Sequence, residues 1–327
     1  MSELRWHPLL EEWVITATHR QERTFHPPPE YCPLCPTRPG MPPTEVPAPD
    51  YEIVVFENRF PSLLREPPTP AVEPTPFSPV RASEGVCEVI LYTADHNATL
   101  ADLPLERIVQ LIHVWRDRYQ ELSRRPEVQY VFIFENKGRE IGVTLSHPHG
   151  QIYAYPFIPP KIERELHAQR RHMRQTGRCL LCEIVAFEVA QRVRIVEENA
   201  HWVAMVPFFA RYPYEVWLLP CAHRRDLLEL NEDEIESLAP ILKRVLMRYD
   251  GLWGFSMPYV MAQHPRPSDG KPHRAWHFHI EFYPPYRTPD KLKYLAGSES
   301  GAGVFINDTL PEQTAAELRA VPLPQTV

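Results

Sequence analysis

The chain contains no long apolar run. None of its hydrophobic stretches approaches the roughly 18 to 20 consecutive apolar residues that a membrane-spanning helix needs. The N-terminal sequence MSELRWHPLLEEW also lacks the basic stretch and the apolar stretch of a secretory signal peptide. We therefore expect no membrane partner for this protein, and we expect it in the cytoplasm.

Positive charge is also scarce. The chain has 35 Lys and Arg against 42 Asp and Glu, which gives a formal net charge of −7. A protein that holds nucleic acid through a broad basic surface needs the opposite balance. We therefore expect small molecules, and no nucleic acid, as binding partners.

Cysteine, in contrast, is present in a pattern. Four of the six cysteines form two short pairs, Cys32-Pro-Leu-Cys35 and Cys179-Leu-Leu-Cys182. A disulfide framework is not expected in a cytoplasmic chain. Such a pair is a redox dithiol, half of a tetrahedral zinc site or two inert thiols. Two copies in a chain with 15 histidines favour metal binding.

The order of motifs after the first cysteine pair is repeated after the second. In each half, β-prone segments end at a histidine and are followed by an amphipathic helix, another β-prone run and a His-x-His segment. In the first half these features are His96, residues 103–122, residues 128–134 and His147-Pro-His149. In the second half they are His223, residues 230–252, residues 257–261 and His277-Phe-His279. This order predicts an internal duplication.

The repeated unit predicts an α+β fold made of two tandem halves, each a mostly antiparallel sheet with long helices packed on it. The basic and polar stretch 159–178 is the best boundary, so we expect an N-terminal half over residues 1–165 and a C-terminal half over 166–327. The Gly-rich segment 295–303 resembles a loop that closes over a phosphate.

The segment His147-Pro-His-Gly-Gln151 is the strongest candidate for chemistry. Residues two apart on a strand share a face, so Pro148 and Gly150 must distort the backbone if the two histidines have separate roles. Gly150 would also let the chain approach a ligand closely. A lone histidine on an apolar strand is usually a core residue. Two that flank a proline, followed by Gly-Gln, indicate a functional site.

This segment, together with Phe134-Glu-Asn-Lys-Gly138, resembles the galactose-1-phosphate uridylyltransferase family, a two-domain branch of the histidine-triad superfamily. The resemblance covers almost the whole chain and implies that each half is a histidine-triad unit. It includes Cys32 and Cys35, Glu57-Asn58, Asp95-His96, Tyr214-Glu-Val-Trp-Leu-Leu-Pro220, and His277-Phe-His279 with Tyr283-Pro-Pro285.

The resemblance implies that His149 is a nucleophile in the N-terminal half, while the C-terminal half is noncatalytic. Its imidazole would take UMP from UDP-glucose, release glucose 1-phosphate and pass UMP to galactose 1-phosphate, which makes UDP-galactose. Gln151 would bind a non-bridging oxygen of the transferred group. A relative that transfers AMP from an ADP-sugar to phosphate, a nucleotide hydrolase of the histidine-triad type, and a zinc-stabilised binding protein without activity are the alternatives.

The resemblance also implies a structural zinc site made by Cys32, Cys35, His96 and His147. For a second metal, two ligand sets compete. The internal repeat favours zinc bound by Cys179, Cys182, His223 and His277. The family pattern instead gives Glu165, His264, His277 and His279, with iron as a candidate metal. His277 cannot serve both sets at once.

Substrate contacts follow from the same resemblance. The matching positions are Arg20, Arg23, Asn58, Asn136, Thr144, Lys293, Tyr294 and Glu299. The last three fall in the segment near 291–307 that a second subunit lends to the hexose phosphate in this family, which implies a homodimer. Within this segment Ser298 replaces a family tyrosine, and residues 300–307 replace a stretch that supplies a glutamine.

Overall fold

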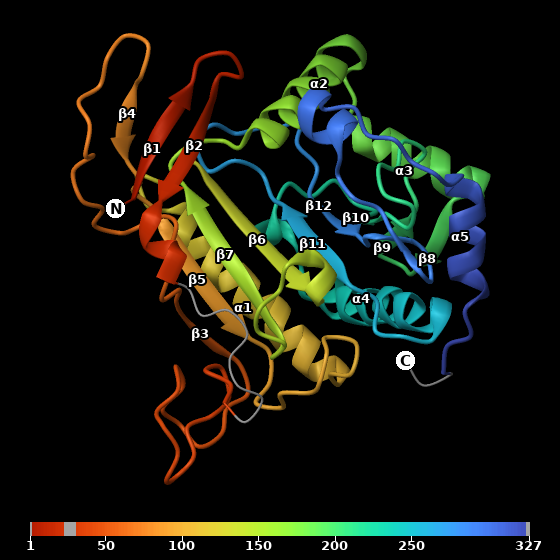
Figure 1. The fold of residues 1–327 in the computed structure, drawn as a ribbon. Helices are drawn as coiled ribbons and strands as arrows, with labels where there is room; N and C mark the ends of the chain where they lie inside the picture. The colour runs from red at the N-terminus through yellow and green to blue at the C-terminus, as the bar shows by residue number, and fades with distance from the viewer. Residues whose placement is uncertain (1, 23–30, 325–327) are drawn as a thin grey trace.

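A computed structural model describes residues 2–22 and 31–324 of the chain (Figure 1). The first half contains β1 (Ser2–His7), β2 (Glu12–Ala17), β3 (Val54–Glu57), β4 (Val80–Ala82), β5 (Val86–Leu91), α1 (Leu105–Ser123), β6 (Tyr130–Lys137) and β7 (His149–Tyr155). The second half contains α2 (Pro160–Thr176), α3 (Leu180–Gln191), β8 (Ile195–Glu198), β9 (Trp202–Met205), β10 (Val216–Pro220), α4 (Glu232–Trp253), β11 (Tyr259–His264), β12 (His279–Tyr283), β13 (Tyr286–Thr288), β14 (Lys291–Leu292) and α5 (Pro311–Ala320). The short turns are η1 (Thr18–Glu22), η2 (Arg139–Ile141), η3 (Leu227–Glu229) and the π-helical η4 (Gly297–Gly301).

One nine-stranded sheet runs through both halves. Its strand order is β3-β5-β7-β6-β11-β12-β10-β9-β8, and every neighbouring pair is antiparallel. The halves meet where β6 pairs with β11, with Phe134 opposite Ala262 and Asn136 opposite Val260. On either side of this seam the repeated strands follow in mirrored order. The duplicated α+β fold predicted from the sequence is therefore confirmed.

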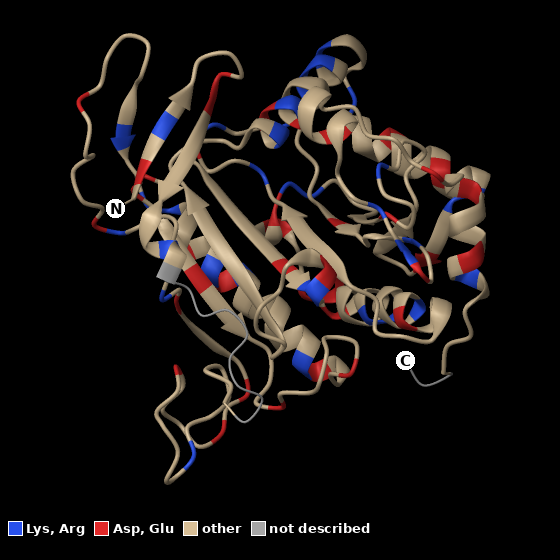
Figure 2. Ribbon diagram, in the orientation of Figure 1, with Lys and Arg blue, Asp and Glu red and all other residues tan. Residues whose placement is uncertain are grey.

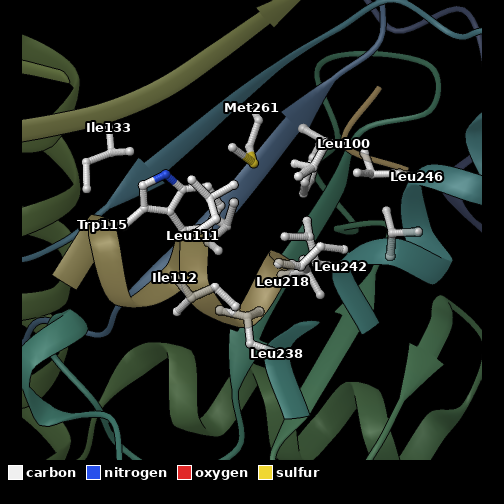
Figure 3. Close-up of a cluster of buried hydrophobic side chains, with 14 of the residues drawn as sticks. Leu100, Leu111, Ile112, Trp115, Ile133, Leu218, Leu238, Leu242, Leu246 and Met261 are labelled. Atoms are coloured by element: carbon white, nitrogen blue, oxygen red, sulfur yellow. The ribbon is translucent and has the colours of Figure 1, made fainter. Parts of the chain in front are cut away.

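The long helices α1 and α4 pack side by side on one face of the sheet (Figures 1 and 3). The predicted amphipathic segments form these two helices, and α4 begins with a capping box between Asn231 and Glu234. Their apolar stripes meet alternate residues of the strands, such as Ile133 of β6 and Met261 of β11. This face is the main hydrophobic core.

The opposite face of the sheet is covered unevenly. Over the second half, α3 packs on the sheet through Leu181 and Val185. Near the seam, Ile162 and Leu166 of α2 pack on Tyr130 of β6 and on Trp276. Over the first half, this face meets Leu34 and Val46 of the segment that holds the first cysteine pair. The uneven cover leaves room for a site on the first half.

A second, three-stranded sheet of β2, β1 and β4 lies beside the first half (Figure 1). Acidic and basic residues are distributed over both halves (Figure 2). No helix among residues 2–22 and 31–324 is long and apolar enough to cross a membrane.

The packing of α1 on α4 gives a test of the core. Leu111 of α1 is fully buried in this core, near Trp115 and Met261, so Leu111→Ala removes apolar contacts and leaves a cavity (Figure 3). We expect a loss of about 2–5 kcal/mol in the free energy of unfolding by urea. Leu9→Ala is the control, because Leu9 is 87% exposed and should change stability by less than about 0.5 kcal/mol. Equal effects of the two changes would contradict this packing.

Candidate active site and metal centres

Strand β7 fixes the positions of His149 and Gln151. It lies between β5 and β6, with His149 opposite Leu91 and Gln151 opposite both Val89 and Phe134. Because successive strand residues alternate, His149 and Gln151 point away from the helices, while Gly150 between them faces the core. The two side chains therefore share the incompletely covered face.

Gly150 is needed for packing on the helical side of β7. A Cβ atom at this position would lie 2.2 Å from the Tyr92 hydroxyl and 3.2 Å from the carbonyl of Phe134. The close approach that the sequence predicts for Gly150 is thus made by Tyr92 within the protein. A larger residue at position 150 would therefore force β7 or Tyr92 to move.

The ring of His149 is oriented by the backbone of His147. Nδ1 of His149 lies 2.8 Å from the His147 carbonyl oxygen. A carbonyl only accepts a hydrogen bond, so Nδ1 carries the proton and the lone pair is on Nε2. His147 itself precedes β7 and turns toward the cysteine pair, which gives the two histidines separate roles.

Cys32, Cys35, His96 and His147 converge into a four-residue cluster. Each residue offers one ligand atom, and the four atoms lie within 4.8 Å of one another. Cys35 Sγ is 3.5 Å from Nδ1 of His96 and 3.5 Å from Nδ1 of His147. Two sulfurs and two imidazole nitrogens are a donor set for tetrahedral zinc.

Protonation in this first cluster suits a cation. Burial lowers the pKa of His147 to about 4, which keeps the imidazole neutral as a ligand must be. Burial and the neighbouring Cys32 raise the pKa of Cys35 to about 11. At neutral pH the Cys35 thiolate is therefore stable only beside a positive charge. Nε2 of His147 lies 2.8 Å from both the Thr93 carbonyl oxygen and the Tyr51 hydroxyl.

Cys179, Cys182, His223 and His277 repeat this arrangement in the second half. Cys182 Sγ is 3.3 Å from Nδ1 of His277 and 3.5 Å from Nδ1 of His223. Nε2 of His277 lies 3.1 Å from the Pro220 carbonyl oxygen. A hydrogen bond from Cys182 lowers the pKa of Cys179, with help from both imidazoles. The donor set again suits zinc.

A third cluster joins Glu165, His264, His279 and Glu281. Glu165 Oε2 is 2.9 Å from Nδ1 of His264, and Glu281 Oε1 is 3.3 Å from Nε2 of His279. Apart from this ion-pair contact, the last two atoms are buried and make no hydrogen bond among the described residues, so both are available to a ligand such as a metal ion. Lys161 forms an ion pair with Glu281.

The second-half geometry separates the two competing ligand sets. His277 faces the thiols, whereas Glu165, His264 and His279 meet elsewhere, with Glu281 in the fourth place. Glu281 was missed in the sequence, although its spacing from His279 puts both on one face of β12. The thiol cluster and the carboxylate cluster therefore share no residue, and the structure contains both.

His149 lies between two cavities. The first is lined by the apolar and aromatic side chains of Leu34, Phe56, Phe60 and Val89 and by Arg20, Asn58 and Gln151. The second, about 570 Å³ in volume, is more polar and includes Asn136, Thr144 and Ser146. Both cavities include His149, so a ligand that occupies both would cross the histidine.

Lys293, Tyr294 and Glu299 do not line these cavities. They lie after β14, where Lys293 Nζ pairs with Glu299 Oε1 at 3.1 Å and Tyr294 is 75% exposed. Arg23 lies outside the described residues. Within the described chain, Arg20, Asn58, Asn136, Thr144 and Gln151 are thus the predicted substrate residues that lie near His149.

The fold and this site define a class of proteins with a duplicated α+β unit, in which a histidine of the first half lines two adjacent cavities. Two family models match the chain: "Galactose-1-phosphate uridyl transferase, N-terminal domain" over residues 1–159 and "Galactose-1-phosphate uridyl transferase, C-terminal domain" over residues 165–326. The chain belongs to the galactose-1-phosphate uridyl transferase family.

Individual relatives agree with this family. The galactose-1-phosphate uridylyltransferase of Thermotoga maritima is 44% identical over 322 residues, covering 98% of each chain. That of Haemophilus influenzae is 36% identical over 331 residues, covering 97% of this chain and 93% of its own. A solved uridylyltransferase structure superposes with a TM-score of 0.87 at 36% identity, covering 98% of each chain. An ADP-glucose phosphorylase from Arabidopsis thaliana shares the fold, with a TM-score of 0.74 at 24% identity, covering 99% of this chain and 100% of its own.

One buried acid lies directly under the site. Glu135 faces Gly150 across the β6–β7 pair and is 3% exposed, and its Oε2 is 3.5 Å from the Tyr92 hydroxyl. Burial raises the pKa of Glu135 to about 7, although the nearby Lys137 charge opposes this. Sequence reasoning did not single it out, because burial of an acid is not visible in a sequence.

This raised pKa makes a pH-dependent prediction for Glu135→Gln. The folded state holds the Glu135 proton up to about pH 7, while the unfolded chain loses it near the ordinary glutamate pKa of 4.5. Wild-type stability should therefore fall, relative to the variant, as the pH rises from 5 to 8. Urea unfolding of both proteins across this range measures the difference. A stability difference that is constant with pH would refute the prediction.

Proposed function

We propose that the protein exchanges UMP between UDP-glucose and galactose 1-phosphate by double displacement at His149. The observation that carries this proposal is the hydrogen bond from His149 Nδ1 to the His147 carbonyl, beside two cavities that meet at the ring. With Nδ1 protonated, Nε2 is a nucleophile near neutral pH. Family membership supports the choice of substrates.

In the first step, the Nε2 lone pair attacks the α-phosphorus of UDP-glucose. An N–P bond forms, the P–O bond to the β-phosphate breaks, and glucose 1-phosphate leaves with the electron pair. The ring keeps its Nδ1 proton and becomes positive, and the His147 carbonyl accepts a stronger hydrogen bond from it. In the second step, a phosphate oxygen of galactose 1-phosphate attacks the same phosphorus and His149 leaves.

Gln151 is suited to stabilise charge on the transferred phosphoryl group. It lies on the same face of β7 as His149, two residues away. The Tyr153 hydroxyl donates to its amide oxygen at 3.4 Å, which orients the amide. Its amide N–H groups would donate to a non-bridging oxygen, where negative charge must be held during each displacement.

The two cavities suit the two ends of the donor substrate. The apolar and aromatic one, with Asn58 and Arg20, would take the uridine, because a flat base needs apolar contact and a few polar partners. The polar one, with Asn136 and Thr144, would take the phosphates and the hexose. We further propose a homodimer in which Lys293, Tyr294 and Glu299 of one copy reach the hexose phosphate of the other. Arg23 would join the nucleotide contacts.

We propose structural zinc for the two cysteine clusters. In each, four protein ligands fill a tetrahedron and leave no position for substrate, so the ion would hold its loop in place and take no part in the bond changes. For the third cluster, the mixed nitrogen and carboxylate oxygen donors suit a second kind of metal, with iron as a candidate. A location in the cytoplasm would keep the cysteine ligands reduced.

The proposed nucleophile predicts a covalent adduct. Incubated with UDP-glucose and no acceptor, the protein should gain the mass of one uridylyl group, which is UMP less one water, and peptide mapping should place it on His149. His149→Gly should give no adduct, because the attacking nitrogen is gone. His167→Gly, which changes an exposed histidine of α2, should form the adduct normally.

The same mass measurement separates the nucleotides. ADP-glucose should give no adduct if the proposal is right. An AMP adduct on His149 would instead assign an ADP-sugar transferase. A UMP adduct that persists in His149→Gly would remove His149 as the nucleophile.

The zinc proposal predicts a change in metal content. Cys35→Ser should lower bound zinc by one ion per chain and lower the melting temperature, because a thiolate ligand of the first cluster is lost. Cys221→Ser is the matched control, since Cys221 is exposed and lies in none of the clusters. Elemental analysis with thermal unfolding measures both. Unchanged zinc in Cys35→Ser would reject the first site.

A further inference from the structure

The two cysteine clusters share one arrangement around the histidine that comes two residues before the end of each His-x-His segment, and they differ in what reaches its Nε2 atom. In each, a histidine turns Nδ1 toward the thiols and Nε2 toward a backbone carbonyl, and its own carbonyl holds the histidine two residues later. In the first cluster a second group reaches Nε2 of His147, the Tyr51 hydroxyl at 2.8 Å. Among the described residues, Nε2 of His277 meets only the Pro220 carbonyl, at 3.1 Å.

The protons on Nε2 of His147 and on the Tyr51 hydroxyl account for all the hydrogen bonds that these two groups make with each other and with their neighbours. Nδ1 of His147 faces the thiols, so Nε2 carries the single ring proton and shares it between the Thr93 carbonyl and the Tyr51 oxygen. The Tyr51 hydroxyl then donates its own proton to the Leu34 carbonyl, 2.9 Å away. Tyr51 is therefore an acceptor from His147 and a donor to Leu34.

These two partners belong to different parts of the site. Leu34 lies between Cys32 and Cys35 and lines the cavity that also contains Asn58 and Gln151. His147 supplies the carbonyl that orients His149. The Tyr51 hydroxyl thus connects Leu34, in the wall of the first cavity, to His147, whose carbonyl orients the ring of His149.

The second half shows that a cysteine cluster does not need such a hydroxyl. There, packing holds the equivalent ring: His279 is 1% exposed and stacks on Trp217 with ring centroids 5.0 Å apart. His149 borders two cavities instead, so its orientation depends on hydrogen bonds. The extra hydroxyl is found in the half whose histidine faces the cavities.

We propose that Tyr51 is a positioning residue for the transfer reaction: its hydroxyl ties His147 to Leu34, so that the His147 carbonyl keeps His149 aimed at the α-phosphorus. The proposal rests on the proposed function. Outer partners of this kind typically change metal affinity or activity by about 10- to 100-fold when removed.

The test is Tyr51→Phe, which removes the hydroxyl and keeps the ring. In a single turnover with UDP-glucose and no acceptor, the rate of adduct formation at saturating substrate should fall about 10- to 100-fold. The half-saturating concentration of UDP-glucose should change less than about threefold, because Tyr51 is not among the residues that line either cavity. Thr37→Val is the control in the same segment, because it removes a hydroxyl that donates to the Val46 carbonyl at 2.8 Å, and Thr37 lines neither cavity.

A second readout does not depend on catalysis. With Co²⁺ in place of zinc, Tyr51→Phe should shift the visible absorption of the first site and speed its loss to a chelator, while the second site in the same molecule stays unchanged. Cys35→Ser and Cys182→Ser each remove one site and so assign the two signals. If the wild type forms no adduct, the proposed function fails, but this arm still reports on Tyr51.

Unchanged rate and unchanged Co²⁺ absorption in Tyr51→Phe would overturn the proposal. So would an equal loss in Thr37→Val, because a general loosening of the segment would then explain both. Should Tyr51→Phe fail to fold, nitrogen-edited NMR of the wild type decides: a slowly exchanging His147 Nε2 proton close to the Tyr51 ring supports the bridge, and its absence overturns it.

Discussion

The hydrogen bond from His149 to the His147 carbonyl is the constraint on which the site depends. It fixes both the tautomer and the direction of the ring, and it is made within a single two-residue step of the backbone. That step is held from several sides: β5 and β6 flank β7, Tyr92 closes on Gly150, and the cysteine cluster receives His147. Nε2 of His149 is therefore positioned by the fold and not by the side chain alone.

The two faces of the sheet divide the work between stability and chemistry. One face is covered in both halves by α1 and α4, and it makes the main core. The other face differs between the halves: α3 covers the second, α2 packs near the seam, and the first carries His149 between cavities. A duplicated unit thus has the same core twice but an accessible histidine only once.

Periodicity and spacing were enough to predict the duplicated fold and the two long helices, because apolar stripes and repeated motifs are local properties. The cysteine and histidine clusters were also predictable, since their ligand types are few and regular. Glu135, Glu281 and Tyr51 were not found, because their roles come from burial and from contacts with distant residues. His277 shows the same limit: its spacing suited two ligand sets, and only three-dimensional geometry separates them.

The seam between β6 and β11 has a consequence for how the molecule holds together. Each half would end at an exposed edge strand if it stood alone, and an unpaired edge seeks another strand. In a single chain the partner edge is always present at a high effective concentration, so completion of the sheet is independent of dilution. The covalent link also lets the halves diverge, because neither has to be self-complementary. One half is then free to carry a buried cluster where the other keeps a histidine beside two cavities.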